Sequence, residues 1–254
     1  MLFTSLRARL MLLVLLVIVP VLGLIVYHGI EVRNKGRLEA LDKVERLARN
    51  ASMLYERTIL ETRQILFTLS QMPQFREQDS PASSKTFADL LKQTKNYSGF
   101  AAVKPNGDVF ASAPYITKPV SFADRPWFQR LAQTRSIAIG EYTRIGRISG
   151  KPTVVIGYPV LDRTGQLLTV LIAGLDLEAL QRTLLKIDLP DEATLNVIDN
   201  HGTILLRFPA PGKFVGKKML DKSIVKLMLT KKEGAEEGVG LGGGGAPLRV
   251  HNGW

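Results

Sequence analysis

Two stretches of the chain decide the fold: SFADRPWFQRL at residues 121–131 and GYPVLDRTGQLLTVLIAGLDLEAL at residues 157–180. The first stretch predicts a helix over RPWFQRLAQT, residues 125–134. The second belongs to two runs, at 152–162 and 167–177, that are rich in apolar and β-branched residues and are separated by the turn sequence RTG. These runs predict two neighbouring strands.

The flanking sequence extends this pattern on both sides. Upstream, GFAAVKPNGDVFASA at residues 99–113 has two β-like runs around a Pro-Asn-Gly-Asp turn, which is a strong signal for a hairpin. A further strand is expected over AIGEYTRI at 138–145, and a helix at 178–187 closes the unit. The fold class is therefore α+β, with an antiparallel-sheet unit over residues 76–188.

The sequence TLNVIDNHGTILLRF at residues 194–208 repeats the order of strand, polar turn with glycine, and strand. We interpret it as the start of a second, related unit that covers residues 189–232. The remaining residues, 233–254, carry four consecutive glycines followed by a short stretch without pattern. We expect this Gly-rich tail to be disordered, because glycine is costly to order. Either a truncated or frameshifted reading frame or a natural flexible tail explains it.

Residues 10–30 contain no formally charged side chain, and a helix of about 20 such residues spans a hydrocarbon layer of about 30 Å. We predict one uncleaved transmembrane helix there, preceded by a cytoplasmic tail at 1–9. A cleaved signal peptide is the alternative. However, the apolar run is longer than the roughly 7–15 residues usual for such a peptide, and no small-residue cleavage site follows it. The short basic tail favours a cytoplasmic N-terminus, which places the rest of the chain outside.

Residues 31–75 are expected to form one long stalk helix. Apolar or small side chains recur from Val44 to Met72 at steps of three, four and seven residues, and Pro73 then ends the pattern. A helix of about 40 residues runs about 60 Å, which is too long for an ordinary globular helix. A stalk that continues from the membrane helix explains the length, and paired stalks predict a homodimer.

The composition excludes several classes of function. The 34 Lys and Arg residues against 23 Asp and Glu give a net charge of +11, but they are spread along the chain without a nucleic-acid-binding motif. The absence of cysteine excludes disulfides, thiolate metal sites and a cysteine nucleophile. The three histidines lie far apart, at no metal-ligand spacing. We therefore expect no nucleic-acid partner, no metal, no cofactor and no enzymatic activity in this chain.

The two stretches SFADRPWFQRL and GYPVLDRTGQLLTVLIAGLDLEAL, at these intervals, resemble the double Cache sensor family. Its members are PAS-like extracytoplasmic domains of bacterial histidine kinases, chemoreceptors and diguanylate cyclases. The resemblance covers roughly residues 31–230. It implies a membrane-distal Cache unit at 76–188, a partial membrane-proximal unit at 189–232, and a single-pass location in the bacterial inner membrane with the sensor region periplasmic. We expect the kinase or cyclase output to belong to a longer parent protein.

The resemblance also implies a ligand pocket on the sheet of the distal unit. In amino-acid-sensing members, an Arg, a Trp and a Tyr spaced as R-x-W-Y hold the ligand carboxylate, and a later Asp holds the ammonium. This chain has Arg125, Trp127 and Phe128 at that spacing. Tyr142 and Asp176 lie near the places of the family's further tyrosine and its aspartate. Because Phe128 replaces a tyrosine, the complete amino-acid signature is absent.

Elementary chemistry leaves two interpretations of these residues open. Arg125 offers a planar set of donors for a carboxylate, and Trp127 offers a flat apolar wall. Alternatively, Arg125 pairs with Asp124, the two aromatic residues belong to the core, and Asp176 caps the helix that follows it. The predicted function is the sensing of a small molecule, either a carboxylate or an amino-acid-like ligand. An ectodomain that binds nothing and only sets dimer geometry is the alternative.

Overall fold

A computed structural model of the chain describes residues 53–184, 195–199, 201–208, 211–218, 233–239 and 245–251, with the isolated positions 19, 20, 23, 27, 46, 49 and 50. Within this described part of the chain, no helix has both the length and the apolar character needed to cross a membrane. The predicted membrane segment at 10–30 and the first part of the predicted stalk fall outside it, apart from those isolated positions.

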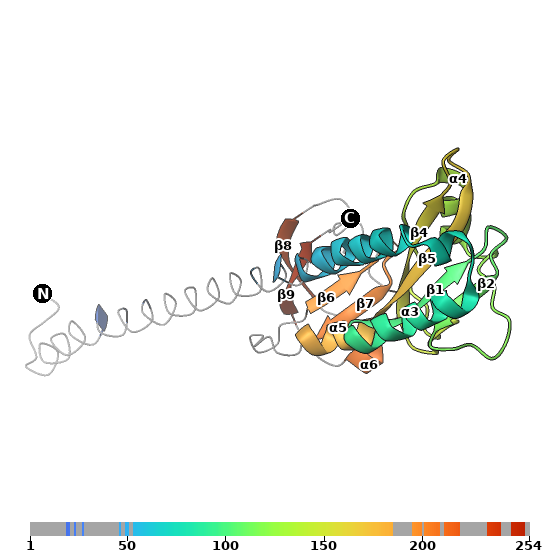
Figure 1. The fold of residues 1–254 in the computed structure, drawn as a ribbon. Helices are drawn as coiled ribbons and strands as arrows, with labels where there is room; N and C mark the ends of the chain where they lie inside the picture. The colour runs from blue at the N-terminus through green and yellow to red at the C-terminus, as the bar shows by residue number, and fades with distance from the viewer. Residues whose placement is uncertain are drawn as a thin grey trace, which may run out of the picture.

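A five-stranded antiparallel sheet forms the centre of the molecule, with the strand order β2-β1-β5-β4-β3 (Figure 1). Its strands are β1 (Tyr97–Val103), β2 (Val109–Ala113), β3 (Ala138–Ile139), β4 (Thr153–Leu161) and β5 (Leu167–Asp176). The predicted hairpins 99–113 and 152–177 are confirmed as β1–β2 and β4–β5. Gly107 and Gly165 have φ values of +98° and +81°, which glycine adopts without strain.

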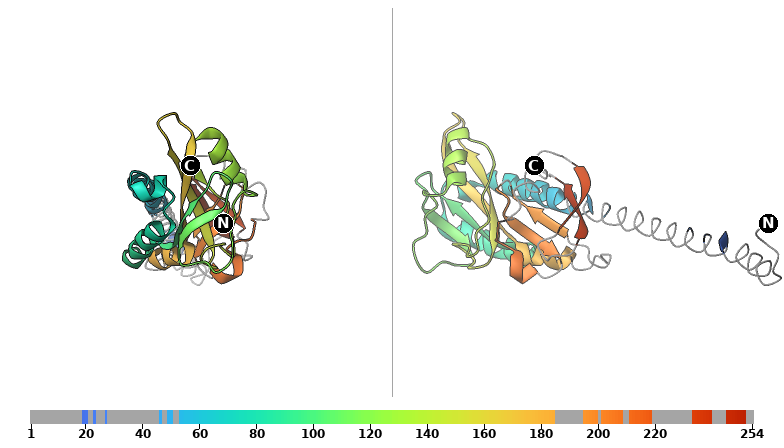
Figure 2. Two further views of the ribbon diagram at one scale, coloured as in Figure 1. Left: turned by 45° about the vertical axis from the view of Figure 1, so that its right-hand side comes forward. Right: turned by 180° about the vertical axis from the view of Figure 1, so that it is seen from behind.

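Helices cover both faces of this sheet, as the turned view in Figure 2 shows. A helix over residues 53–70, the short α2 (Pro73–Arg76) and α3 (Ser80–Gln93) lie on one face. On the other face lies α4 (Pro126–Thr134), which confirms the predicted helix. Because both faces are covered, β1 is buried along its whole length and has no polar outer face.

The strand predicted over 138–145 is much shorter in the structure, where β3 ends at Ile139. Gly140 lies against the ring of Trp127, since a Cβ atom there would come within 2.8 Å of a ring carbon. The chain then leaves the sheet edge and returns at Thr143, whose backbone pairs with that of Thr153 through two hydrogen bonds of 2.9 Å. The segment 140–152 is therefore a loop that folds over the sheet.

The predicted strand–turn–strand segment of the second unit is confirmed. After α5 (Leu177–Leu184), β6 (Leu195–Ile198) and β7 (Ile204–Phe208) pair in a separate two-stranded sheet, and α6 (Pro211–Phe214) follows. The Asp199 carboxylate stabilises the turn by accepting the backbone N–H groups of His201 and Thr203, both at 2.8 Å. Leu205 and Leu206 pack into the core beneath the first unit's helices.

The Gly-rich tail differs from our expectation of disorder over residues 233–254. Strands β8 (Glu233–Val239) and β9 (Gly245–His251) pair as an antiparallel hairpin of seven matched residues on each side. The bonds of such a ladder join backbone groups, so a high glycine content does not prevent the pairing.

Candidate functional site

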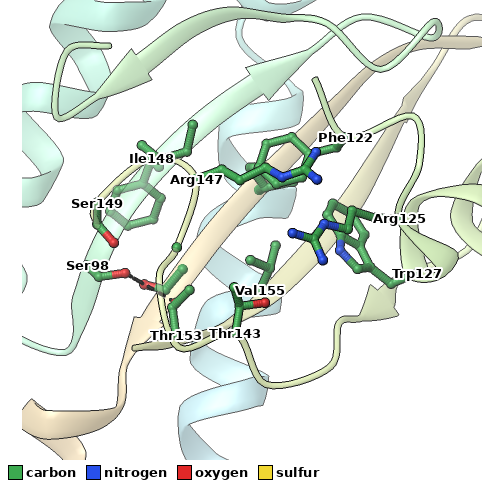
Figure 3. Close-up of a pocket in the computed structure, with 15 residues that line it drawn as sticks. Ser98, Phe122, Arg125, Trp127, Thr143, Arg147, Ile148, Ser149, Thr153 and Val155 are labelled. Carbon is green, nitrogen blue, oxygen red and sulfur yellow. Dashed lines mark hydrogen bonds between the residues drawn. The ribbon is translucent and has the colours of Figure 1, made fainter. Parts of the chain in front are cut away.

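A hollow opens on the face of the sheet that carries α4; its empty space of about 460 Å³ includes open solvent at the mouth. Strands β1, β4 and β5 form its floor, and the loops 121–127 and 143–149 form its walls (Figure 3). Its polar lining consists of Ser98, Arg125, Thr143, Arg147, Ser149 and Thr153. Its apolar lining includes Phe100, Phe122, Trp127, Ile148, Val155 and Ile172.

Arg125 precedes α4 and extends into this hollow, with its guanidinium pointing toward Val155 and Thr143 (Figure 3). The side chain is partly buried. It forms no hydrogen bond and no ion pair with any residue that the structure describes; only its backbone is bonded, to Phe122 and to the first turn of α4. A partly buried guanidinium without a protein partner presents its donors to whatever enters the hollow.

The second arginine of the hollow, Arg147, is already engaged. Its two terminal nitrogens donate to the two carboxylate oxygens of Asp124, each at 2.7 Å, and one of them also donates to the Ser121 carbonyl. Its guanidinium lies 5.7 Å from the centre of the Phe122 ring. The hydrogen bonds from Arg147 hold the pKa of the Asp124 carboxyl below its ordinary value. The Asp124–Arg147 pair joins one wall of the hollow to the other. The Arg125 guanidinium has no hydrogen bond or ion pair of its own among the described residues.

Trp127 lines the hollow with one edge while its ring is buried in the core of this face. The glycine of the GYPV sequence, Gly157, makes room for it, because a Cβ atom at that position would meet the indole at 2.8 Å. Phe128, the next residue, packs at right angles to Trp127 with ring centres 5.8 Å apart and is buried in the same core. Phe128 is not among the residues that line the hollow.

The other two predicted site residues also lie away from the hollow. Tyr142 packs against the core on the opposite side, and its ring contacts Gly216 of the second unit, where a Cβ atom would lie 2.5 Å from a ring carbon. This partial burial raises the pKa of its hydroxyl above the ordinary value. Asp176 is buried and accepts the N–H of Ala179 at 2.9 Å, as a helix cap does, and it pairs with Lys151 at 3.2 Å.

Of the five site residues predicted from the sequence, the structure brings two, Arg125 and Trp127, to the hollow. The prediction did not include Arg147 or a pair of buried hydroxyls that also line it. Ser98 and Thr153 lie on adjoining parts of the floor, with their oxygens 3.3 Å apart. The glycine of the GLDL sequence, Gly174, makes room for them, since a Cβ atom there would lie 2.8 Å from the Ser98 oxygen. A glycine inside a strand indicates that another group approaches the backbone closely, but it does not identify that group.

Metal binding has no support in the described part of the chain, where no three His, Cys, Asp or Glu side chains gather. The hollow offers instead one unpaired cation, a set of hydroxyls and flat apolar walls. This lining suits a small organic ion that carries a negative charge.

Part of the chain is similar to sporulation kinase D of Bacillus subtilis (strain 168), with 28% identity over 131 residues. The match takes in 50% of this chain and 25% of the kinase, so the chain spans only part of that relative's length.

The fold is shared with solved structures of receptor ectodomains. The extracellular domain assigned to the histidine kinase rpHK1S-Z16 superposes with a TM-score of 0.69 at 16% identity, over 85% of this chain and 88% of that one. The ligand-binding domain of the Pseudomonas fluorescens chemoreceptor CtaA, in complex with L-isoleucine, superposes with a TM-score of 0.56 at 18% identity, over 73% and 75%. At these identities the likeness shows the fold alone.

The match that settles the family is a model of the Cache domain, dCache_1, which covers residues 33–246 and therefore most of the 254-residue chain. It agrees with the antiparallel sheet between two helical layers and with the second, smaller unit that follows. The chain belongs to the Cache domain family.

Proposed function

We propose that this chain is the extracytoplasmic sensor region of a membrane-anchored signalling receptor, and that it senses a small anion bound in the hollow. The observation that carries the proposal is the guanidinium of Arg125, which lines the hollow without a partner among the described residues. A cation that the protein leaves unpaired in a partly enclosed site favours a ligand of opposite charge, because pairing offsets its lost hydration.

The ligand contacts follow from the chemistry of the lining. Arg125 would hold a carboxylate by two parallel charge-assisted bonds, each with a net value of roughly 1.5–3 kcal/mol. Trp127 and Phe122 would bound the apolar part of the ligand from the α4 side. Ligand binding stabilises one arrangement of the loops over the sheet, and a receptor responds only if its two states differ in affinity.

The membrane topology is part of the same proposal. Residues 10–30 would form a single membrane helix, 31–75 a stalk that pairs in a homodimer, and the units 76–188 and 189–232 would lie outside the cytoplasm. The positive N-terminal tail supports this orientation. Alkaline phosphatase fused after residue 190 should be active in cells, and a cytoplasmic reporter at that position should be silent. The reverse pattern would contradict the topology.

The sensing role is tested with the purified full chain in detergent micelles and a panel of small carboxylates, amino acids and amines. We expect a carboxylate to raise the thermal midpoint, because a ligand at 100 times its Kd stabilises the folded state by about 2.7 kcal/mol. Arg125→Ala should weaken that ligand about tenfold to a hundredfold. Arg125→Lys should restore little, since an ammonium lacks the planar fork.

Arg144→Ala is the matched control, because Arg144 is an exposed arginine of the neighbouring loop that does not line the hollow. It should bind the carboxylate as the unsubstituted chain does. If Arg125→Ala and Arg144→Ala behave alike, Arg125 does not hold the ligand. If no member of the panel stabilises the chain, the alternative of an ectodomain that only sets dimer geometry is favoured.

A further inference from the structure

We propose that the sensed anion is a small hydroxy-carboxylate and not an amino acid. This inference rests on the proposed function, since it takes the hollow as the ligand site. It is carried by the hydroxyl pair Ser98–Thr153, by the charge balance of the lining, and by the engagement of Asp176 elsewhere.

The hydroxyl pair presents acceptors to the hollow. Thr153 donates its single proton to the Leu175 carbonyl at 2.9 Å, and Ser98 donates its own either to the Gly174 carbonyl at 3.2 Å or to the Thr153 oxygen at 3.3 Å. A hydroxyl has one proton and two lone pairs. Once both protons are used within the protein, the two oxygens can only accept hydrogen bonds from a ligand. Both residues are buried, so a ligand group placed there would have to donate.

The ligand group that donates to these two oxygens must be neutral. Among the described residues that line the hollow, none is acidic. The carboxylates of Asp124 and Asp176 are already paired within the protein. Asp124 pairs with Arg147, and Asp176 pairs with Lys151 and accepts the N–H of Ala179. An ammonium in this hollow would therefore have no free carboxylate to pair with and would lie near the positive charge of Arg125. A hydroxyl supplies the same hydrogen bond without that cost.

Arg125 and the hydroxyl pair lie on different parts of the site. Figure 3 shows Arg125 reaching in from the side of α4, and Ser98 and Thr153 lying together on the far part of the floor. We expect the ligand to place its carboxylate at Arg125 and its hydroxyl at the Ser98–Thr153 pair. The net charge of such a ligand, −1, also balances the single unpaired arginine.

Three probes of equal carbon number separate the possibilities: sodium propionate, sodium lactate and alanine, titrated calorimetrically into the full chain. Lactate should bind about threefold to tenfold more tightly than propionate, which corresponds to one neutral hydrogen bond. Alanine should bind at least about tenfold more weakly than lactate, because its ammonium has no counter-ion in the hollow.

Two variants locate the effect. Ser98→Ala and Thr153→Val each remove one of the two acceptors; at least one of them should bring lactate down to the affinity of propionate, both should leave propionate unchanged, and Ser112→Ala should alter neither. Ser112 is the matched control, since it is equally buried but donates to the Pro114 carbonyl outside the hollow. Thermal midpoints without ligand verify that each variant folds.

The outcomes distinguish this inference from the proposed function. If lactate and propionate bind equally tightly and Arg125→Ala loses both, the proposed contact with a ligand hydroxyl is wrong, and anion sensing stands. Tighter binding of alanine than of lactate would overturn the ligand class. If none of the three probes binds, the proposed ligand class is wrong. If Arg125→Ala also responds to every other anion as the unsubstituted chain does, the proposal of anion sensing is wrong as well.

Discussion

Replacing Asp176 by alanine and by asparagine separates its two interpretations, as a ligand residue and as a helix cap. The side chain is buried, with 4% of its surface exposed, and both of its oxygens are engaged. Oδ1 accepts the N–H of Ala179 in the first turn of α5, and Oδ2 accepts from Lys151. We therefore expect substitution to lower stability in the absence of any ligand.

The magnitude follows from these two contacts. Loss of an N-cap costs about 0.5–2 kcal/mol. The Lys151 side chain is 56% exposed, so loss of the ion pair adds no more than about 1 kcal/mol after screening by solvent. Asp176→Ala should thus destabilise the chain by about 0.5–3 kcal/mol. Asp176→Asn should cost about 1 kcal/mol or less, because asparagine caps helices as well as aspartate does.

Thermal melts of the ligand-free chain measure this difference. For a chain of this size, 1 kcal/mol corresponds to about 2–4 °C, so Asp176→Ala should melt roughly 1–12 °C lower and Asp176→Asn no more than about 4 °C lower. Neither variant should change the relative affinities of lactate and propionate. An Asp176→Ala variant that melts normally but loses a ligand response would refute the reasoning and restore Asp176 to the binding site.

Two further predictions concern the walls of the hollow. Gly157→Ala should destabilise the fold by about 1–3 kcal/mol and change the near-ultraviolet signal of Trp127, because the new methyl group meets the indole; an unperturbed signal would contradict that packing. Since the pKa of Asp124 is lowered in the folded state, its pairing with Arg147 stabilises the chain above pH 3.8 and is lost as the pH falls further. The difference in thermal midpoint between the unsubstituted chain and Asp124→Asn should therefore shrink at acid pH, and a constant difference would argue against the pair.

The parts of the fold that could be predicted from the sequence are those encoded by neighbouring residues. The turns at Gly107 and Gly165 need a positive φ, and the sequence supplies glycine at each, so both hairpins were predicted. The helix α4 was predicted over RPWFQRLAQT, and in the structure it begins at the proline of that segment, a residue suited to the first turn. Strand β3 was overestimated, because the loop that replaces it from Gly140 onward packs against Trp127 and has no local signal in the sequence.

The binding site could be predicted only where its residues lie close together in the sequence. Arg125 and Trp127 come from one short motif, and the structure brings both to the hollow. The pairing of Arg147 with Asp124 joins residues 23 positions apart, and the contact of Ser98 with Thr153 joins residues 55 positions apart. Nothing in a single sequence identifies such partners, because their proximity is created by the order of the strands.

The position of Tyr142 shows how a small difference in backbone geometry decides which residues face a ligand. Thr143 pairs with Thr153 at the edge of the sheet and lines the hollow, and successive residues of an extended segment point to opposite sides. Tyr142 therefore faces away, toward the opposite core and Gly216. A shift of that pairing by one residue would exchange the two side chains. Because Gly216 has a φ of +80° and no side chain, the tyrosine ring fits against its backbone, and the loop that lines the hollow is thereby in contact with the second unit.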